Sequence, residues 1–424
     1  MTVNLKSMAH EARQAALKLR ILSREDKDRA LSLLAEKIMA EQDAIIAANV
    51  EDLAQAEAAG LAPAMIDRLR LDGDRLAGIA ADLRRVTELD DPVGGIFDER
   101  VMPNGLRVHK QRVPIGVLAV IYESRPNVTI DVSGLALKSG NAVILRGGSE
   151  TLHSNRALMA VIREALAESG LPRGAVQFID SSDRGLVMDM LQMGDEIDML
   201  IPRGGAGLHR FCRENSRIPV ITGGIGVCHL FVDQSADLPA AVNVIRNAKV
   251  QRPSVCNALD TVLVHQAVAA EAIPAIVRTL SAEGVSFRFG PDALGVMAAH
   301  PALQEFVAPA GPDDFDTEWL SLVLGIKVVA GLEEALDHIQ THSTGHSDGI
   351  LTQDPTNADC FVQAVDSAAV YVNASTRFTD GSQLGLGAEV AISTQRLHAR
   401  GPMALEALTT YKWVIRGENH VRPD

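Results

Sequence analysis

One cysteine in this sequence lies where covalent chemistry is possible. Cys256 follows Lys249 and Arg252 in a polar segment between a predicted helix and an apolar run at residues 261–264. Only a thiolate is a good nucleophile, and nearby cations lower the pKa of a thiol. The alternative is a buried, inert cysteine, which is the commoner state of a free cysteine. The segment alone leaves both interpretations open, with Cys256 as a candidate covalent catalyst.

Two glycine-rich turns are candidates for binding a phosphate group. Each follows a predicted strand and precedes a predicted helix, and together they comprise Arg146, Gly147, Gly148, Ser149, Arg203, Gly204 and Gly205. Glycine allows backbone N–H groups to approach a phosphate, and the N-terminus of the following helix favours an anion. Neither turn has the G-x-G-x-x-G or the G-x-x-x-x-G-K-[ST] pattern, so a plain tight turn is the alternative.

Two further positions, each after a predicted strand, could contribute to a binding or catalytic site. Asn127 follows the first predicted sheet strand and could donate its amide hydrogens to an oxyanion, although without further context a helix N-cap is the commoner role of such an asparagine. Thr222 and Gly223 begin a glycine-rich run that is flexible enough for close approach of the backbone. His229, His342 and His346 have no partner in sequence, which indicates structural histidines.

The pattern of elements predicts an α/β protein with two parallel sheets. Residues 5–90 have helical periodicity, and an Asn-Gly pair at Asn104 predicts a hairpin over 100–113. From residue 115 onward, apolar runs alternate with helical stretches, which is typical of a doubly wound, Rossmann-type sheet. The alternation resumes after Cys256 as a second α/β domain, and residues 408–415 form a last predicted strand.

Composition limits the class of protein. The chain has 424 residues, enough for two or three domains, with 47% apolar and 22% charged residues. A net charge of −14 disfavours nucleic-acid binding, and no apolar stretch approaches the length of a membrane span. The four cysteines are far apart and form no metal-binding motif. We therefore expect a cytoplasmic enzyme with free thiols and no metal.

Several longer stretches resemble one family. Residues 122–128 (YESRPNV), 247–258 (NAKVQRPSVCNA) and 394–403 (TQRLHARGPM) are similar to the gamma-glutamyl phosphate reductase branch of the aldehyde dehydrogenase superfamily. The resemblance covers essentially the whole chain. It implies an aldehyde dehydrogenase-like fold, with a Rossmann-type cofactor domain at 1–98 and 115–232 and a catalytic domain at 233–385. A small β oligomerisation element would comprise 99–114 and 386–424.

The resemblance also implies roles for individual residues. Cys256 matches the nucleophile and Asn127 the amide of the oxyanion hole. The cofactor, NADP(H), would contact residues 146–149, Gly204, Gly205, Thr222, Gly223 and Glu318, with Arg146 and Ser149 suited to its 2′-phosphate. Arg125, Arg203, Lys249 and Arg252 are candidate ligands of the substrate's phosphate and carboxylate.

The position of Thr222 distinguishes reactions within the superfamily. Aldehyde-oxidising members carry there a glutamate that activates water, 34 residues before the nucleophile (256 − 222 = 34). A threonine favours reduction of L-glutamyl 5-phosphate through a cysteine thioester that exchanges with phosphate. The resemblance further implies a homo-dimer or homo-tetramer, and glutamate 5-kinase as the upstream enzyme that supplies the substrate. A hydrolytic aldehyde dehydrogenase and a non-catalytic scaffold remain the alternatives.

Overall fold

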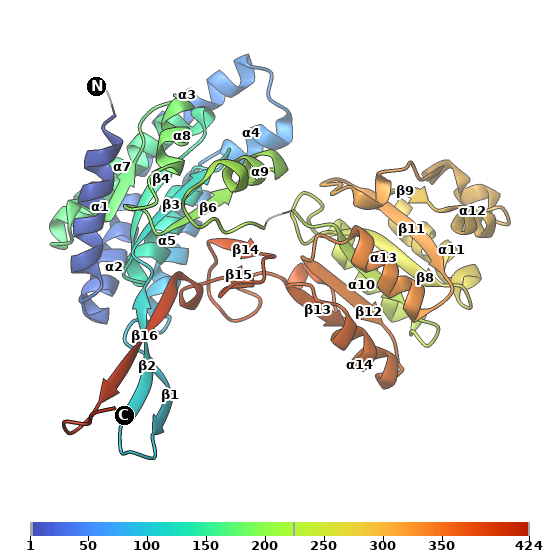
Figure 1. The fold of residues 1–424 in the computed structure, drawn as a ribbon. Coiled ribbons are helices and arrows are strands. Elements are labelled where there is room, and N and C mark those ends of the chain that lie inside the picture. The colour runs from blue at the N-terminus through green and yellow to red at the C-terminus, as the bar shows by residue number, and fades with distance from the viewer. Residues whose placement is uncertain (1–2, 224, 423–424) are drawn as a thin grey trace. The chain divides into compact units, whose positions relative to one another are not determined.

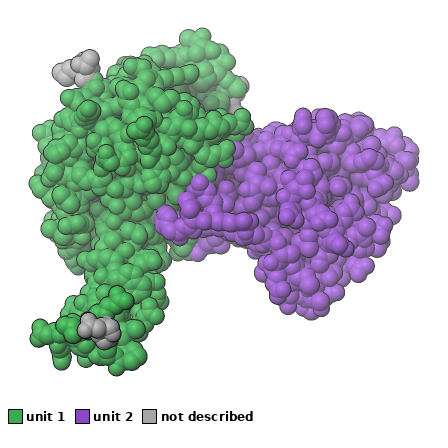
Figure 2. Space-filling model, in the orientation of Figure 1, with its two compact units in different colours: residues 1–222, 385–391, 403–424 green, residues 223–384, 392–402 purple. Residues whose placement is uncertain are grey.

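The computed structural model describes residues 3–223 and 225–422 and confirms the α/β class. The chain forms two compact units (Figures 1 and 2), each described by itself below. Unit 1 comprises Met1–Thr222, Gly385–Ala391 and Met403–Asp424. Unit 2 comprises Gly223–Leu384 and Ile392–Pro402. None of the described helices combines the length and the apolar character needed to cross a membrane.

Unit 1 begins with the predicted run of helices. These are α1 (Leu5–Leu19), α2 (Arg24–Ala40), α3 (Gln42–Ala58), α4 (Pro63–Leu69) and α5 (Gly73–Glu88). Ser23 caps α2 by accepting a hydrogen bond from the backbone N–H of Asp26, as the sequence indicates.

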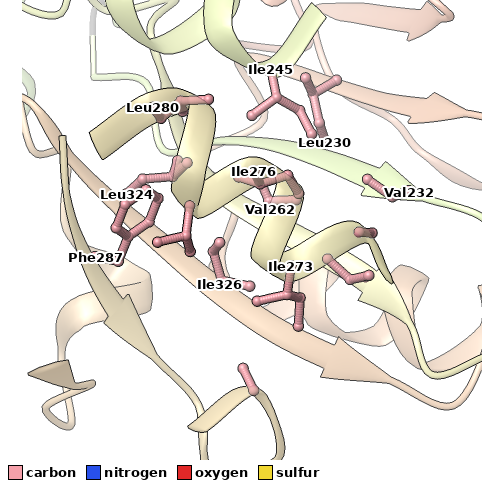
Figure 3. Packing of buried hydrophobic residues seen from close by; sticks show 14 of the residues in the cluster. Leu230, Val232, Ile245, Val262, Ile273, Ile276, Leu280, Phe287, Leu324 and Ile326 are labelled. Atoms are coloured by element: carbon pink, nitrogen blue, oxygen red, sulfur yellow. The ribbon is translucent and has the colours of Figure 1, made fainter. Parts of the chain in front are cut away.

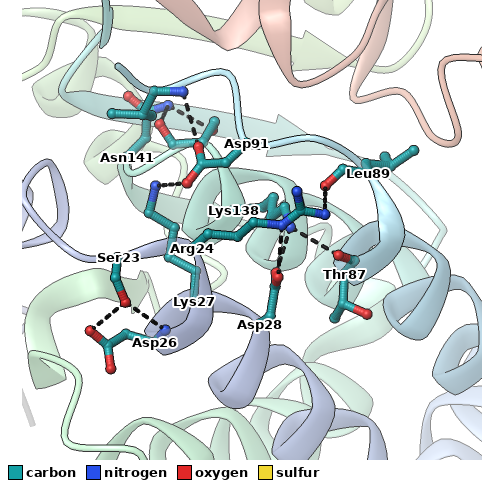
Figure 4. A network of polar contacts seen from close by, with 12 residues as sticks. Ser23, Arg24, Asp26, Lys27, Asp28, Thr87, Leu89, Asp91, Lys138 and Asn141 are labelled. Carbon is teal, nitrogen blue, oxygen red and sulfur yellow. Dashed lines mark hydrogen bonds and ion pairs between the residues drawn. The ribbon is translucent and has the colours of Figure 1, made fainter. Parts of the chain in front are cut away.

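Two buried lysines fasten α2 to its surroundings (Figure 4). The ammonium of Lys27 lies 2.7 Å from the carboxylate of Asp91, and Lys138 donates to Asp28 and to the carbonyl of Thr87. A buried ammonium is tolerated only when it is paired. The pairs therefore fix α2 against the segment after α5 and against α6.

The first sheet has four parallel strands in the order β5-β4-β3-β6. The strands are β3 (Val117–Tyr122), β4 (Ala142–Arg146), β5 (Val176–Phe178) and β6 (Met199–Arg203). Strands β3 and β4 are buried on both faces, as expected for a sheet covered by helices. The helices are α6 (Asn127–Lys138), α7 (Leu152–Glu168), α8 (Gly185–Leu191) and α9 (Ala206–Asn215), with short 3₁₀ turns η1 (Ser149–Thr151) and η2 (Arg173–Ala175).

The second sheet forms unit 2 and has seven parallel strands in the order β10-β9-β11-β8-β7-β12-β13. They are β7 (Cys228–Val232), β8 (Leu259–His265), β9 (Ser286–Phe289), β10 (Val307–Pro309), β11 (Val323–Val329), β12 (Ser347–Leu351) and β13 (Ala369–Val372). The helices are α10 (Leu238–Val250), α11 (Ala269–Ser281), α12 (Pro291–Met297), α13 (Leu332–His342) and α14 (Pro355–Ala364), with η3 (Pro301–Phe306), η4 (Asp314–Asp316) and η5 (Thr376–Phe378). Figure 3 shows the core, in which Ile273, Ile276 and Leu280 of α11 pack on the strands.

A three-stranded antiparallel ribbon extends from unit 1 (Figure 1). It contains β1 (Ile96–Val101), β2 (Arg107–Pro114) and β16 (Thr409–Arg416), in the order β1-β2-β16. Gly105 in the turn has a φ of +91°, which explains the Asn-Gly signal. A two-stranded sheet of β14 (Ala391–Ser393) and β15 (Gly401–Met403) and the turn η6 (Glu406–Leu408) complete the chain.

The structure differs from the sequence predictions mainly at the boundary between the sheets. Strand β7 pairs with β8 and β12 in the second sheet, so the expected boundary after residue 232 is wrong, and unit 2 begins at Gly223. Residues 220–221 make only an isolated bridge through Val220 to Leu200. Local apolar character identifies a strand but does not say which of two parallel sheets it joins.

Candidate active site

Four loops that lead into neighbouring strands meet at one edge of the second sheet. The strands β11, β8, β7 and β12 are adjacent in this order. One residue of the site lies shortly before the start of each strand: Glu318 before β11, Cys256 before β8, Gly226 before β7 and Thr344 before β12. The amino ends of parallel strands lie at the same edge. Ligands of open α/β sheets ordinarily bind at the carboxyl ends. Cys256 lies instead at the amino edge of the second sheet, before β8.

The backbone around Cys256 is tightly held. The carbonyl oxygen of Cys256 lies so close to Gly226 that a Cβ there would be 1.6 Å away. The thiol of Cys228 donates to the same carbonyl at 3.3 Å. Burial raises the pKa of the Cys228 thiol, which keeps it neutral and able to donate. Cys256 itself is half-buried, whereas Cys228 is fully buried.

Glu318 lies beside this backbone. Its carboxylate accepts a hydrogen bond of 2.9 Å from the N–H of Gly226. Burial, and after it the negative charge of Asp260, raises the pKa of Glu318 to about 7. Leu320, two residues on, has a φ of +49°, a strained value for a leucine. Strained backbone of this kind is common at functional sites.

Lys249 is buried rather than presented to a ligand. Its side chain is completely inaccessible, and its ammonium lies 3.5 Å from the carboxylate of Asp260, which also accepts the N–H of Trp319. Burial lowers the pKa of Lys249 and raises that of Asp260 to about 6. The pair thus links α10 to β8 and to the segment that carries Glu318.

One arginine near Cys256 has no signal in the sequence. Arg377, in η5, donates its Nε–H to Oε1 of Gln251 at 2.7 Å and an Nη1–H to Oδ1 of Asn257, the residue after Cys256. It lies in the segment after β13, far from Cys256 in sequence. Only the tertiary fold brings the two together.

Unit 1 contains a cavity of about 860 Å³ at the carboxyl end of the first sheet. Its lining comes from the ends of β3 and β4, from α9 and from α3, and includes Arg146, Gly148, Ser149, Ser182 and Arg184. The size is that of a pocket for a nucleotide-sized ligand. The location agrees with the rule for open α/β sheets.

The cationic end of this cavity fits a phosphate group. Arg146 is buried, and its Nε–H has no hydrogen-bond partner among the residues that the structure describes. Burial, and also the nearby charge of Arg184, holds the pKa of Arg146 below its ordinary value, against the opposite effect of Glu150. A buried N–H without a partner is costly. A dianionic group would satisfy it and would relieve the repulsion between the two arginines.

Sequence reasoning missed Ser182 and Arg184 in this cavity. They follow β5 and precede α8, in the same strand-to-helix arrangement as the two glycine turns. The segment contains no glycine before Gly185, whereas both predicted phosphate sites are glycine-rich turns. A rule based on polar residues after each strand would have found them.

A carboxylate shapes another wall of the cavity. Glu150 accepts hydrogen bonds from the backbone N–H and the hydroxyl of Ser124, at 2.7 and 2.9 Å. Ser124 has a φ of +49°, so these bonds hold strained backbone at the end of β3. Glu123 accepts the N–H of Gly205, which ties the turn after β6 to the same edge.

Asn127 is not a helix N-cap. Helix α6 starts at Asn127 after Pro126, and no side chain caps it. Instead, Nδ2 of Asn127 donates to Asp131 at 2.8 Å. Desolvation raises the pKa of Asp131 to about 6, against the effects of Asn127 and of the positive charge of Arg203. The bond leaves Asn127 a second N–H for another acceptor.

The predicted site residues therefore fall into two groups. Unit 1 contains Arg125, Asn127, Arg146, Gly147, Gly148, Ser149, Arg203, Gly204, Gly205 and Thr222. Unit 2 contains Gly223, Lys249, Arg252, Cys256 and Glu318. Gly147 and Gly204 lie against Asn155 and Glu123, so a Cβ at either position would clash. Among the described residues, no group of three or more His, Cys, Asp or Glu side chains could hold a metal ion.

Comparisons with known proteins agree with this geometry. The model of the aldehyde dehydrogenase family matches residues 2–293. A gamma-glutamyl phosphate reductase of Roseiflexus castenholzii is 57% identical over 421 residues, 99% of each chain. One from Aeromonas salmonicida is 57% identical over 412 residues, 97% of this chain and 98% of its own. The crystal structure of gamma-glutamyl phosphate reductase from Thermotoga maritima superimposes with a TM-score of 0.96 at 47% identity, covering 99% of this chain and 100% of that one.

Proposed function

The chain belongs to the aldehyde dehydrogenase family and, within it, to the gamma-glutamyl phosphate reductases, and we propose that it reduces L-glutamyl 5-phosphate to L-glutamate 5-semialdehyde with NADPH. The relatives are named for this reduction, which would make the chain an oxidoreductase of proline biosynthesis. The observation that carries the proposal is the half-buried Cys256 at the meeting point of four loops, with its backbone held by Gly226 and Cys228.

Cys256 acts as the nucleophile in this proposal. Its thiolate attacks the acyl carbon, phosphate leaves, and a thioester remains on the enzyme. The backbone N–H of Cys256 and the amide of Asn127 are the proposed donors to the oxyanion. Asp131 supports this role for Asn127, because it accepts one amide hydrogen and fixes the direction of the other.

The cavity of unit 1 is the proposed site of the adenosine half of NADP(H). The 2′-phosphate would be held by Arg146, Arg184, Ser149 and Ser182. Gly148 would allow the backbone to approach the ligand. The proposed partner of the nicotinamide ribose is Glu318. The chemistry that the cofactor supplies when bound is a hydride for the thioester carbon.

Thr222 and Lys249 support reduction over hydrolysis in different ways. A threonine at position 222 has no carboxylate to activate water, so the thioester persists until it is reduced. The loop between α10 and β8, residues 251–258, carries Cys256 and is called the nucleophile loop below. Because Lys249 is buried and paired with Asp260, we assign it to the support of this loop and not to the substrate. Of the four substrate-binding candidates, Arg125, Arg203 and Arg252 then remain.

The test is an assay in the reverse direction. Glutamate 5-semialdehyde is supplied with NADP or NAD, with and without inorganic phosphate, to the wild type and to Cys256→Ala. We expect phosphate-dependent reduction of NADP, weaker activity with NAD, and a loss of at least about three orders of magnitude in the variant. Turnover without phosphate would favour the hydrolytic reaction. Full activity of Cys256→Ala would rule out covalent catalysis.

A further inference from the structure

The segment after β13 is fastened onto the nucleophile loop. The hydroxyl of Thr376 donates to the carbonyl of Asn257 at 2.7 Å, and Nδ2 of Asn257 donates to the carbonyl of Thr379 at 2.9 Å. Asn257 directly follows Cys256 and is itself buried. These bonds place η5, with Arg377, against Asn257, the residue that follows Cys256, within unit 2.

Arg377 uses only neutral partners in this position. Its hydrogen bonds go to the side-chain oxygens of Gln251 and Asn257. Arg252, in the nucleophile loop itself, is exposed and makes no hydrogen bond to any described residue. Burial, and after it the charge of Arg252, lowers the pKa of Arg377, while Asp380 acts in the opposite direction. Gln251, which accepts the Nε–H of Arg377 at 2.7 Å, directly precedes Arg252 in the chain, so the two arginines lie on adjoining segments and their like charges repel each other.

No described carboxylate forms an ion pair with either arginine. Elsewhere in unit 2 arginines do find such partners, as Arg246 does with Glu283 and Arg400 with Asp366. Two cations beside a nucleophile, one of them held in place by hydrogen bonds, are an arrangement that stabilises an incoming anion. Arg377 is already oriented by its two neutral bonds, so little side-chain freedom is lost when an anion binds.

We propose that Arg377 and Arg252 bind the phosphate of the acyl phosphate substrate while Cys256 attacks its acyl carbon. This inference rests on the proposed function and assigns its leaving-group site. The phosphate is attached to the carbon that the thiol attacks, so it must lie next to Cys256. Its dianion matches two arginines, whereas the substrate's α-carboxylate carries one charge and lies at the other end of the carbon chain.

The pair then stabilises the charge that develops during acyl transfer. The bond from Sγ of Cys256 to the acyl carbon forms, and the bond from that carbon to the phosphate oxygen breaks. The electron pair of the broken bond stays on the phosphate, which takes a proton from water and leaves as inorganic phosphate. Two guanidinium groups at that oxygen lower the energy of the leaving group in the transition state.

The first experiment needs neither cofactor nor turnover. The full-length protein is alkylated with iodoacetamide at neutral pH, and modification of Cys256 is followed by peptide mass spectrometry, with inorganic phosphate or with chloride of equal ionic strength. Phosphate is expected to slow alkylation of the wild type several-fold. Arg252→Gln should lose this protection, and the control Arg246→Gln, on the exposed surface of unit 2, should keep it.

Arg252→Gln is the decisive variant, because it removes no hydrogen bond that holds the loop. If phosphate does not slow alkylation of the wild type, or protects Arg252→Gln equally well, the proposal is overturned. Failure of the proposed function would look different, since the semialdehyde assay would then be inactive while phosphate still protected Cys256.

Steady-state kinetics separate the two anionic groups of the substrate. In the reverse reaction, Arg252→Gln and Arg377→Lys should raise the KM for phosphate about tenfold or more, which corresponds to the loss of roughly 1.4 kcal/mol of binding. The KM for the semialdehyde should change less than twofold. A rise confined to the semialdehyde KM would show that the arginines bind the α-carboxylate, and the proposal would be wrong.

Discussion

At the scale of single residues, a buried ion pair between Lys249 of α10 and Asp260 of β8 flanks the loop that carries Cys256. Lys249 and Asp260 are almost inaccessible to solvent. Burial lowers the pKa of Lys249 and raises that of Asp260, and so favours the neutral form of both side chains. Such a pair contributes little net stability, but removing one partner leaves an uncompensated charge. The pair acts mainly by holding neighbouring segments in place, because Asp260 also accepts a hydrogen bond from the backbone N–H of Trp319, the residue after Glu318.

Single and double substitutions test this pair. Lys249→Met and Asp260→Asn should each lower the free energy of unfolding by about 3–5 kcal/mol, and the double variant should recover most of the loss. Chemical denaturation measures all three. The control Arg246→Met breaks an exposed pair and should cost less than about 1 kcal/mol. Additive losses in the double variant would contradict a coupled pair.

Glu318 gives the protein a specific pH dependence. Its pKa is about 7 in the folded chain, against 4.5 for an ordinary glutamate. Between these values the folded state binds a proton that the unfolded state has lost, so the free energy of unfolding falls as the pH rises through this window. Asp260, with a pKa of about 6, adds a slope of the same sign.

The substitution Glu318→Gln should remove its part of this slope. Glutamine still accepts the N–H of Gly226 but does not titrate. The variant should match the wild type near pH 4.5 and be more stable above pH 7, with Tm higher by about 2–4 °C for each kcal/mol gained. Thermal unfolding at both pH values measures the difference. Parallel pH profiles for the two proteins would show that Glu318 has an ordinary pKa.

At the scale of elements, the two sheets use opposite edges. The cavity of unit 1 lies at the carboxyl ends of β3 and β4, whereas Cys256 lies at the amino end of β8. At the amino edge no helix N-terminus follows the strands, so anion binding there must come from side chains. The proposed phosphate ligands, Arg252 and Arg377, would meet this need. The glycine at this edge, Gly226, does not form a phosphate-binding turn. It allows the loops before β7 and β8 to approach each other closely.

The loop before β7 should therefore be intolerant of a side chain. Gly226→Ala would place a Cβ on the carbonyl oxygen of Cys256 and displace the nucleophile loop. Because misplacement of a reacting group by about 1 Å can cost about a hundredfold in rate, we expect a loss of that order in kcat. Gly295→Ala, at an open position in α12, is the control and should be fully active. Equal activity of both variants would show that the loop adapts.

At the scale of the whole molecule, the ribbon of unit 1 presents an apolar face on an edge strand. Tyr411, Trp413 and Ile415 alternate along β16 and are 46%, 47% and 61% exposed. Lys110 of β2 lies over the rings of both aromatic residues, at 4.7 and 5.0 Å from their centroids. Exposed apolar edge strands ordinarily pair or are covered. This face supports the proposal that the chain forms a homo-oligomer.

Charges on this face should dissociate the oligomer. Trp413→Lys combined with Ile415→Lys should give a species of 45.3 kDa, the mass of one chain, in analytical ultracentrifugation. Lys412→Glu changes the neighbouring position, whose side chain points to the other face of the strand, and should leave the mass of the wild type unchanged. An unchanged mass for the double variant would place the interface elsewhere.

The sequence by itself determined the α/β class, nearly all the strands, the ribbon and the choice of Cys256. These depend on local properties: apolar runs of strand length, the Asn-Gly turn, and polar residues next to a thiol. The long motifs added the family, which the comparisons confirm. A local signal also exists for Arg184, which follows a strand, but no glycine lies between that strand and Arg184, so the segment does not have the form of a glycine turn.

Only the tertiary structure decided which side chains are available for chemistry. It buried Lys249 and left Arg252 exposed, although both precede Cys256 at similar distances in the chain. It assigned β7 to the second sheet and brought Arg377 to Asn257 across more than a hundred residues. Burial and pairing depend on contacts between segments distant in sequence. The sequence therefore indicated Cys256 as the candidate nucleophile, and the fold determined which charged groups lie near it.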